Sequence, residues 1–155
     1  MLLISDKSTY KLMLELRKIA SHVTKKIITH SLNNIFMHGN EPPKAIAKAM
    51  LNSDAIICLT TMSLAHTEAR HKATNRGSRY LSLPQYSEKI FQSKSLNVNF
   101  ANFKKKANKI KKILDKKNKI TVINDHGTFI NLDIENRKAN AAPGLCYKPG
   151  MIPSP

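Results

Sequence analysis

The sequence predicts an α/β fold: an open, mostly parallel sheet of about five strands, with helices on both faces and one later antiparallel strand. Short apolar segments alternate along the chain with segments in which apolar residues recur every three or four positions. Such alternation is typical of strands joined by crossover helices. The chain has 155 residues and is 41% hydrophobic, which suffices for one ordinary domain with its own core.

The first forty residues predict two strands and one helix. Residues 1–5 form an apolar segment that indicates a buried strand. Asp6 or Ser8 can cap the helix that follows. The apolar face of this helix has spacings of four, three and four residues and consists of Leu12, Leu16, Ile19 and Val23. A short second strand is predicted over residues 25–30, and residues 31–40 form a loop.

The middle of the chain gives the clearest patterns. Residues 41–51 predict a helix, because the two prolines near its start fit a first helical turn. A strand is predicted over residues 55–60, whose first five residues are continuously apolar, as expected for a central parallel strand that is buried on both faces. A helix is then predicted over residues 63–76, with Gly77 at its end. A strand over 80–83 follows it.

The last third predicts one more helix and two strands. Residues 103–114 carry a helical stripe composed of Phe103, Ala107, Ile110 and Leu114. Residues 119–124 predict a fifth strand. Apolar and polar residues alternate over 130–135, which indicates a half-buried, antiparallel strand. We therefore expect an α/β domain over 1–135 and a polar tail rich in proline and glycine, without fixed structure, over 136–155.

The chain is strongly basic, with 26 Lys and Arg against 10 Asp and Glu and a formal net charge of +16. A positive field attracts polyanions, but few of the basic residues are arginine, the usual reader of phosphates and bases. Many lysines fall opposite the apolar stripe of 103–114 and first indicate a solvated helix face. As a polyanion-binding patch, the candidates are Lys104, Lys105, Lys109 and Lys112. We do not expect specific nucleic-acid binding.

Several classes of protein are not supported by the sequence. No apolar run approaches the length of a membrane-spanning helix, and no signal peptide is visible, so we expect a cytoplasmic protein without membrane contact. Two distant cysteines exclude a cysteine-based zinc site and a disulfide framework. Cys58 lies within an apolar run and is expected in the core. The glycines are isolated, so a dinucleotide or P-loop site is unsupported.

Polar residues follow the strand predicted over 55–60, at the edge where open α/β sheets bind their ligands. Thr60, Thr61 and Ser63 come directly after that strand. His66 and Arg70 are four residues apart, which places them on one side of a helix. Together these residues could line a polar pocket, while the alternative is a solvent-facing helix start.

Two further polar residues precede the helix predicted over 41–51. His38 and Glu41 are candidates for contact with a substrate or a neighbouring domain, and the alternative is turn chemistry with helix capping. His66 and His71 do not form a metal pair, because residues five apart on a helix point in different directions. We therefore assign no metal and no cofactor to this chain.

Three segments resemble a known family. They are Met37-His-Gly-Asn-Glu-Pro-Pro43, the run from Asp54 to Arg70, and Gly77-Ser-Arg79. The second contains a strand, a Thr/Ser turn and the pattern S-x-x-H-T-x-A-R. This arrangement is similar to the amino-terminal half of the thermophilic aminopeptidase family, metallopeptidases of the leucyl aminopeptidase or aminopeptidase T type. The similarity is collinear over most of the chain, and residues 37–79 are its most specific part.

The resemblance implies removal of amino-terminal residues from peptide substrates by a two-metal site. The family's metal ligands lie in a carboxy-terminal half, beginning in an N-L-P-x-G-E segment, and none maps onto a residue of this chain. A divalent metal such as zinc or cobalt is thus implied only for the full-length member. We expect the amino-terminal domain or a fragment of such an enzyme, from a split or degraded gene and without activity alone. Its implied partner is the missing metal-binding domain or a second copy.

Other functions remain open at this point. A related group of iron-dependent dihydroxypyridine ring-cleaving dioxygenases resembles the same family and differs in the missing half. A stand-alone basic module could instead bind RNA or another polyanion through the lysines between 104 and 119. A non-catalytic domain that pairs with its own other half or with another copy is a third alternative.

Overall fold

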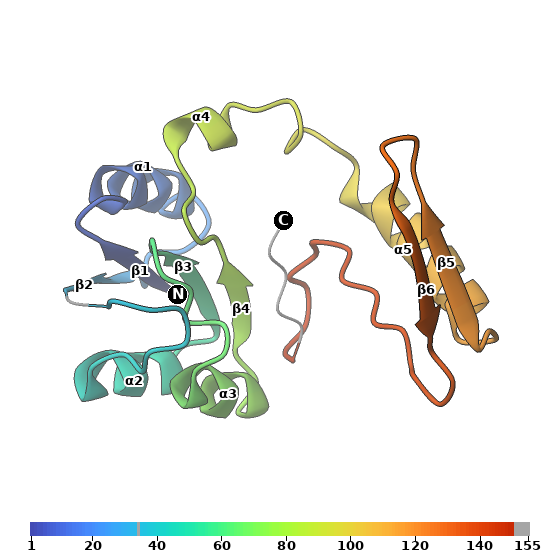
Figure 1. The fold of residues 1–155 in the computed structure, drawn as a ribbon. Coiled ribbons are helices and arrows are strands. Elements are labelled where there is room, and N and C mark those ends of the chain that lie inside the picture. Colours follow the sequence, from blue (N-terminus) through green and yellow to red (C-terminus); the bar gives the residue numbers. More distant parts are fainter. Residues whose placement is uncertain (34, 151–155) are drawn as a thin grey trace. The chain divides into compact units, whose positions relative to one another are not determined.

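The computed structural model describes residues 1–33 and 35–150, and the chain divides into two compact units (Figure 1). The first unit comprises Met1–Val98 together with the described residues from Gly144 onward. The second unit is Asn99–Pro143. Each unit has its own sheet.

The first unit contains a four-stranded parallel sheet, which confirms the predicted α/β class. Its strand order is β2-β1-β3-β4, and every neighbouring pair is parallel. The strands are β1 (Leu2–Asp6), β2 (Ile28–Leu32), β3 (Ala55–Leu59) and β4 (Arg79–Ser82). Because β1 and β3 are central, their side chains are buried on both faces, in agreement with their apolar sequences.

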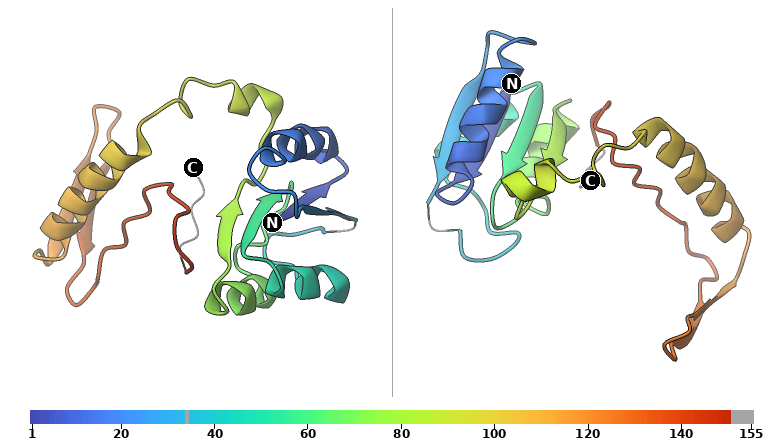
Figure 2. Two further views of the ribbon diagram at one scale, coloured as in Figure 1. Left: turned by 180° about the vertical axis from the view of Figure 1, so that it is seen from behind. Right: turned by 90° about the horizontal axis from the view of Figure 1, so that it is seen from above.

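Helices cover both faces of this sheet (Figure 2). The helices are α1 (Tyr10–Ala20), α2 (Lys44–Leu51), α3 (Glu68–Asn75) and the short α4 (Glu88–Phe91). On the side of α1, Met13 packs with Leu3 and Leu59. On the side of α2 and α3, Ile4 and Ile56 pack in a separate cluster with residues of both helices. Alternate residues of a strand thus enter different cores, as the period of two requires.

The second unit consists of one helix and one hairpin: α5 (Phe100–Leu114), β5 (Lys119–Ile123) and β6 (Phe129–Asp133). The fifth strand expected in the parallel sheet is instead antiparallel to β6, so the parallel sheet has four strands. The reason lies in the turn. The Asn124 side chain accepts hydrogen bonds from the backbone N–H groups of His126 and Thr128 at 3.0 Å each, and Gly127 has a φ of 89°. This compact turn returns the chain beside β5.

Several boundaries differ from the predicted ones. α2 begins at Lys44 with Pro43 as its N-cap, rather than at residue 41, and β2 spans Ile28–Leu32 rather than residues 25–30. α1 ends at Ala20, so Val23 lies beyond it and is 82% exposed. Ile19 lies within α1 but is 65% exposed, so it does not belong to the buried side of the helix. Its N-cap residue is Thr9 rather than Asp6 or Ser8. α3 begins at Glu68 instead of residue 63, because the Thr67 side chain accepts a hydrogen bond from the Arg70 backbone N–H and caps the helix there.

Candidate functional site

The carboxyl edge of the parallel sheet contains a pocket of about 440 Å³. It lies where the strand order reverses: the chain runs from β1 outward to β2 on one side, and from β3 outward to β4 on the other. Ligands of open α/β sheets bind at this switch point. The pocket is lined by Asp6, Lys7, Ser8, Leu32, Asn33, Ile35, Thr60, Thr61 and Met62.

Asp6, the last residue of β1, joins the two loops that border this pocket. Its carboxylate accepts hydrogen bonds from the backbone N–H groups of Ser8 at 3.0 Å and Thr9 at 3.1 Å. It also accepts one from the backbone N–H of Thr61, at the end of β3. The Ser8 and Thr61 hydroxyls lie 2.8 Å apart and close the link. The carboxylate therefore links the loop after β1 to the loop after β3 at the edge of the pocket.

The pKa of Asp6 follows from these contacts. Partial burial raises it, but the hydrogen bonds from Ser8, Thr61 and Thr9 outweigh this effect and lower the pKa to about 2. Asp6 therefore stays ionised near neutral pH. Lys7 and Asn33 supply the other polar side chains of the lining beside the apolar Leu32.

The structure brings only two of the predicted site residues to this pocket. Thr60 and Thr61 line it, but the hydroxyl of Thr60 donates to the backbone carbonyl of Met62 at 2.6 Å. Ser63 is not part of the lining. Its backbone N–H donates to His38 Nδ1 at 3.0 Å.

Glu41 lies at the start of α3, not at the pocket. Its carboxylate accepts hydrogen bonds from the backbone N–H of Ala69 at 3.1 Å and from that of Glu68. Gly39 contributes a further link, since its backbone N–H donates to the carbonyl of Ser63 at 2.9 Å. Residues 38–41 are thus bound to the segment that leads into α3. We call this set of contacts the loop–helix joint.

His66 and Arg70 do not line one pocket, contrary to the sequence prediction. His66 precedes the helix and is exposed, whereas Arg70 is 7% exposed. The Arg70 Nε donates to the carbonyl of Ala65 at 2.6 Å, and its Nη1 donates to the Thr74 hydroxyl at 3.4 Å. The four-residue spacing misled because residue 66 is not helical. The guanidinium therefore forms hydrogen bonds within the segment 65–74.

Cys58 and Tyr80 are buried polar groups of the same unit. Cys58 is 1% exposed and lies beside the hydroxyl of Thr60, 3.4 Å from its sulfur. Burial raises the pKa of the Cys58 thiol and raises that of Tyr80 well above the ordinary value. A protonated, enclosed thiol is a poor nucleophile. The predicted core role of Cys58 is confirmed.

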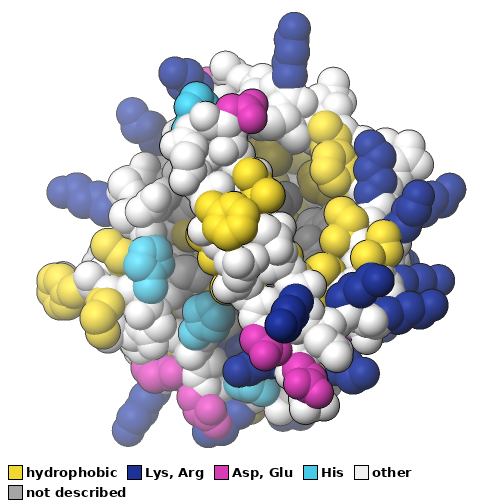
Figure 3. Space-filling view, turned by 45° about the vertical axis from the view of Figure 1, so that its right-hand side comes forward, with side chains coloured by type: hydrophobic (Ala, Val, Ile, Leu, Met, Phe, Trp, Pro, Cys, Tyr) yellow, Lys and Arg dark blue, Asp and Glu magenta, His cyan; other side chains and the backbone are white. Residues whose placement is uncertain are grey.

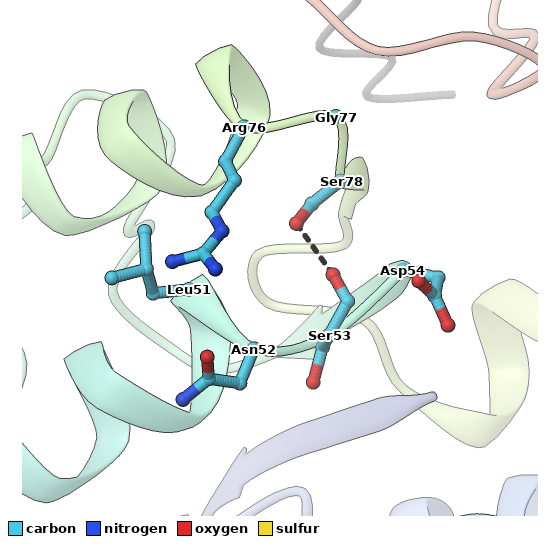
Figure 4. Close-up of a pocket in the computed structure, with 7 residues that line it drawn as sticks. All are labelled: Leu51, Asn52, Ser53, Asp54, Arg76, Gly77 and Ser78. Carbon is cyan, nitrogen blue, oxygen red and sulfur yellow. Dashed lines mark hydrogen bonds between the residues drawn. The ribbon is translucent and has the colours of Figure 1, made fainter.

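A second pocket of about 280 Å³ lies at the opposite, amino edge of the sheet (Figure 4). The turns that end α2 and α3 form it, and the Ser78 hydroxyl donates to the carbonyl of Ser53 there. Arg76 extends from the end of α3 toward Leu51 (Figure 4). This pocket lies between helix ends, away from the ligand edge of the sheet. Leu51, Asn52, Ser53, Asp54, Arg76, Gly77 and Ser78 line it.

The predicted polyanion candidates all lie on α5. Lys105, Lys109 and Lys112 are exposed, and Lys104 is half-buried. Their neighbour Lys111 forms a salt bridge of 2.6 Å with Asp115. Basic side chains are widespread on the face shown in Figure 3, and acidic ones are sparse.

The metal implied by the resemblance does not fit the residues that the structure describes. Among them, no group of three or more His, Cys, Asp or Glu side chains is placed to hold a metal ion. We therefore derive no metal-dependent step from this chain. In the described part of the chain, no helix has the length and apolar character needed to cross a membrane.

Known proteins do not assign this chain to a family. No family model, curated protein or solved structure matches this chain. The resemblance of residues 37–79 to the aminopeptidase family rests on their sequence pattern alone.

Proposed function

We propose that this chain is the amino-terminal α/β domain, or a fragment containing it, of a cytoplasmic metal-dependent leucyl aminopeptidase. It has a structural role and works with a carboxy-terminal half that carries the metal ligands. The observation that supports this proposal most directly is the loop–helix joint. The residues that resemble the family most specifically are the residues that build it.

The contacts explain the Ser, Thr and Arg of the pattern S-x-x-H-T-x-A-R. Ser63 orders the turn, since its hydroxyl accepts a hydrogen bond from the Ala65 backbone N–H at 3.1 Å. Thr67 caps α3 and donates its hydroxyl hydrogen to the carbonyl of Leu64 at 2.8 Å. Arg70 holds the carbonyl of Ala65 from inside. Ser63, Thr67 and Arg70 thus each have a folding role that a non-catalytic domain would retain.

The chemistry of the proposed enzyme belongs to the other half. A divalent metal bound there would act as a Lewis acid and would lower the pKa of a bound water. The described residues of this chain would supply a folded support for that half. We expect no hydrolysis of a peptide by this chain alone.

The proposal is tested by reconstitution. The purified chain is incubated with zinc or cobalt and a leucyl peptide, with and without a separately produced carboxy-terminal half of a leucyl aminopeptidase. We expect no leucine from the chain alone and a clear increase when both pieces are present. The half alone and a chelator-treated mixture are the controls. Enzyme-like release by the chain alone, or no increase from a folded, metal-loaded half, would contradict the proposal.

The same mixture distinguishes the alternative of a ring-cleaving dioxygenase. In that case, iron and a dihydroxypyridine replace zinc and the peptide. Loss of the dihydroxypyridine absorbance with oxygen consumption, in the absence of peptide hydrolysis, would favour the dioxygenase.

A further inference from the structure

One side of α5 carries a row of lysines. Lys105, Lys109 and Lys112 follow one another at spacings of four and three residues. Residues three and four apart are neighbours on the surface of a helix, so these three side chains share one side. With a rise of about 1.5 Å per residue, the row covers about 10 Å of the helix. We call these three residues the lysine ridge.

The lysine ridge lies opposite the half-buried side of α5. The half-buried residues recur at spacings of four, three, four and three, and they are Phe100, Lys104, Ala107, Lys111 and Leu114. At about 100° per residue, the middle of this side lies about 150° from the middle of the ridge. All three ridge lysines are exposed. Lys104, one of the polyanion candidates predicted from the sequence, therefore belongs to the other side of the helix.

No carboxylate of the described residues neutralises the ridge. The 15 residues of α5 include six lysines and no Asp or Glu. The ridge lysines form no salt bridge with any described residue. The lysine of α5 that does form one is Lys111, which lies 2.6 Å from the Asp115 carboxylate on the half-buried side. Like charges four residues apart destabilise a helix, so an anion that spans the ridge would stabilise it.

The chemistry of the ridge favours phosphates over other partners. Lysine presents a compact ammonium charge and lacks the planar fork with which arginine reads bases. Such charges bind the phosphates of a nucleic acid without regard to sequence. The centre of a protein interface is usually depleted in lysine, and a membrane-surface helix places its apolar side against the lipid. The ridge presents charge alone.

We infer that the lysine ridge is a binding site for the phosphate backbone of RNA or DNA, and that it binds independently of base sequence. This agrees with the small number of arginines in the chain. The inference does not rest on the proposed function, because the ridge lies outside residues 37–79, the most specific part of the resemblance to the aminopeptidase family.

The test measures binding of the full chain to labelled uridine RNA and thymidine DNA strands of about 20 nucleotides, by fluorescence anisotropy at salt concentrations from about 50 to 200 mM. The ridge variant combines Lys105→Gln, Lys109→Gln and Lys112→Gln, and glutamine keeps a high helix propensity. The matched control removes the same charge from exposed lysines of three other helices, by Lys11→Gln, Lys48→Gln and Lys89→Gln. A third variant replaces the three ridge lysines with arginine.

We expect the wild-type chain to bind both strands, with an affinity that falls as the salt concentration rises. The ridge variant should bind about tenfold more weakly, and its slope of log affinity against log salt should be smaller by about two, since each phosphate contact of a single strand contributes about 0.7. The control should lose less than about threefold and keep the wild-type slope, because dispersed charges act only through the overall field. The arginine variant should bind as the wild-type chain does.

Three outcomes would overturn the inference. Equal losses in the ridge variant and the control would show that net charge alone attracts the strands. The second is that the wild-type chain binds neither strand at the lowest salt concentration. Binding to phosphatidylserine vesicles that the ridge variant abolishes, without binding to either strand, would assign the ridge to a membrane surface. Circular dichroism of each variant establishes that the helices are intact. None of these outcomes changes the result expected from reconstitution with a carboxy-terminal half.

Discussion

The carboxylate of Glu41 accepts a hydrogen bond from the backbone N–H of Ala69 at 3.1 Å, across 28 positions of sequence. It accepts a second from the neighbouring N–H of Glu68. These N–H groups belong to the first turn of α3, where the helix has no acceptor of its own. A negative charge there also interacts favourably with the helix dipole. Glu41 thus caps a helix that is distant in sequence.

Replacing Glu41 with alanine should destabilise the first unit. Loss of a charged cap costs about 1–2 kcal/mol, and Glu41→Gln should cost less because its amide oxygen still accepts one hydrogen bond. Urea unfolding followed by circular dichroism measures the difference. Glu15→Gln is the control, since Glu15 forms only an exposed salt bridge with Lys18. Equal stability of Glu41→Ala and the wild-type chain would contradict the capping role.

Asp6 should make stability depend on acid pH. Its pKa is about 2 in the folded chain against a reference value of 3.8. A lowered folded pKa contributes stability that is present above about pH 4 and is lost as the pH falls toward 2. Asp6→Asn should therefore be less stable at pH 7 and should lose less stability between pH 4 and pH 2.

Urea unfolding of the wild-type chain and Asp6→Asn at pH 7, 4 and 2.5 tests this expectation. The two free energies of unfolding should approach each other at the lowest pH, because the carboxylate of the unfolded wild-type chain is protonated there while that of the folded chain is still mostly ionised. Asp125→Asn, in the exposed hairpin turn, serves as the control and should behave as wild type at every pH. A constant difference between Asp6→Asn and the wild type across this range would refute the assignment.

The buried guanidinium of Arg70 should not tolerate replacement by lysine. Its Nε and Nη1 reach two different acceptors, the carbonyl of Ala65 and the hydroxyl of Thr74. A lysine ammonium lacks this planar arrangement, so one buried acceptor loses its partner at a cost of about 1–3 kcal/mol. Thermal unfolding of Arg70→Lys measures the loss. Arg76→Lys, at an exposed position, should leave the melting temperature nearly unchanged.

Local sequence patterns correctly predicted the strands that are determined by their own residues. The continuous apolar run of β3 and the alternation in β6 both correspond to strands. The start of α3 was missed, although Thr67 followed by the acidic Glu68 is a helix-start signal. Ser63 offered the same signal earlier in the chain, but its hydroxyl accepts a hydrogen bond from the Ala65 backbone N–H and orders a turn there instead of starting a helix.

The features of the candidate site that the sequence did not reveal depend on contacts between residues that are distant in the chain. Asp6 lies 55 residues from Thr61, so no spacing rule links them. The pairing of β5 with β6 likewise removed a strand from the parallel sheet. The stripe on α5 was predicted correctly as a helix pattern, but the described residues do not bury it. The apolar stripe indicates which side of the helix can pack against another element, but it does not identify that element.

Gly77 should resist substitution because of its backbone conformation. It follows α3 with a φ of 112°. Its N–H donates to the carbonyl of Thr74 at 3.1 Å, and the next N–H, from Ser78, donates to the carbonyl of Ala73 at 3.0 Å. This pair of bonds is a Schellman motif. No atom lies within 4 Å of an added Cβ, so strain alone should destabilise Gly77→Ala by about 1 kcal/mol.

Chemical denaturation of Gly77→Ala provides the measurement. Ala47→Gly in α2 is a useful comparison, because it changes a helix interior where alanine is preferred. Both changes should lower stability, but for opposite reasons: the first adds a side chain to a left-handed backbone, and the second removes one from a right-handed helix. A stabilised Gly77→Ala would show that the backbone here can relax to a negative φ.

The two units should differ in their resistance to local opening. β1 has four buried residues out of five, whereas every residue of β6 is exposed. Amide groups exchange through local opening, and opening is easier where few apolar contacts must be broken. Hydrogen exchange of the full chain should therefore show strong protection at Leu3 and Ile4 and weak protection at Ile130. Equal protection of β1 and β6 in the free chain would contradict this expectation, because it would mean that the hairpin opens no more easily than the buried sheet.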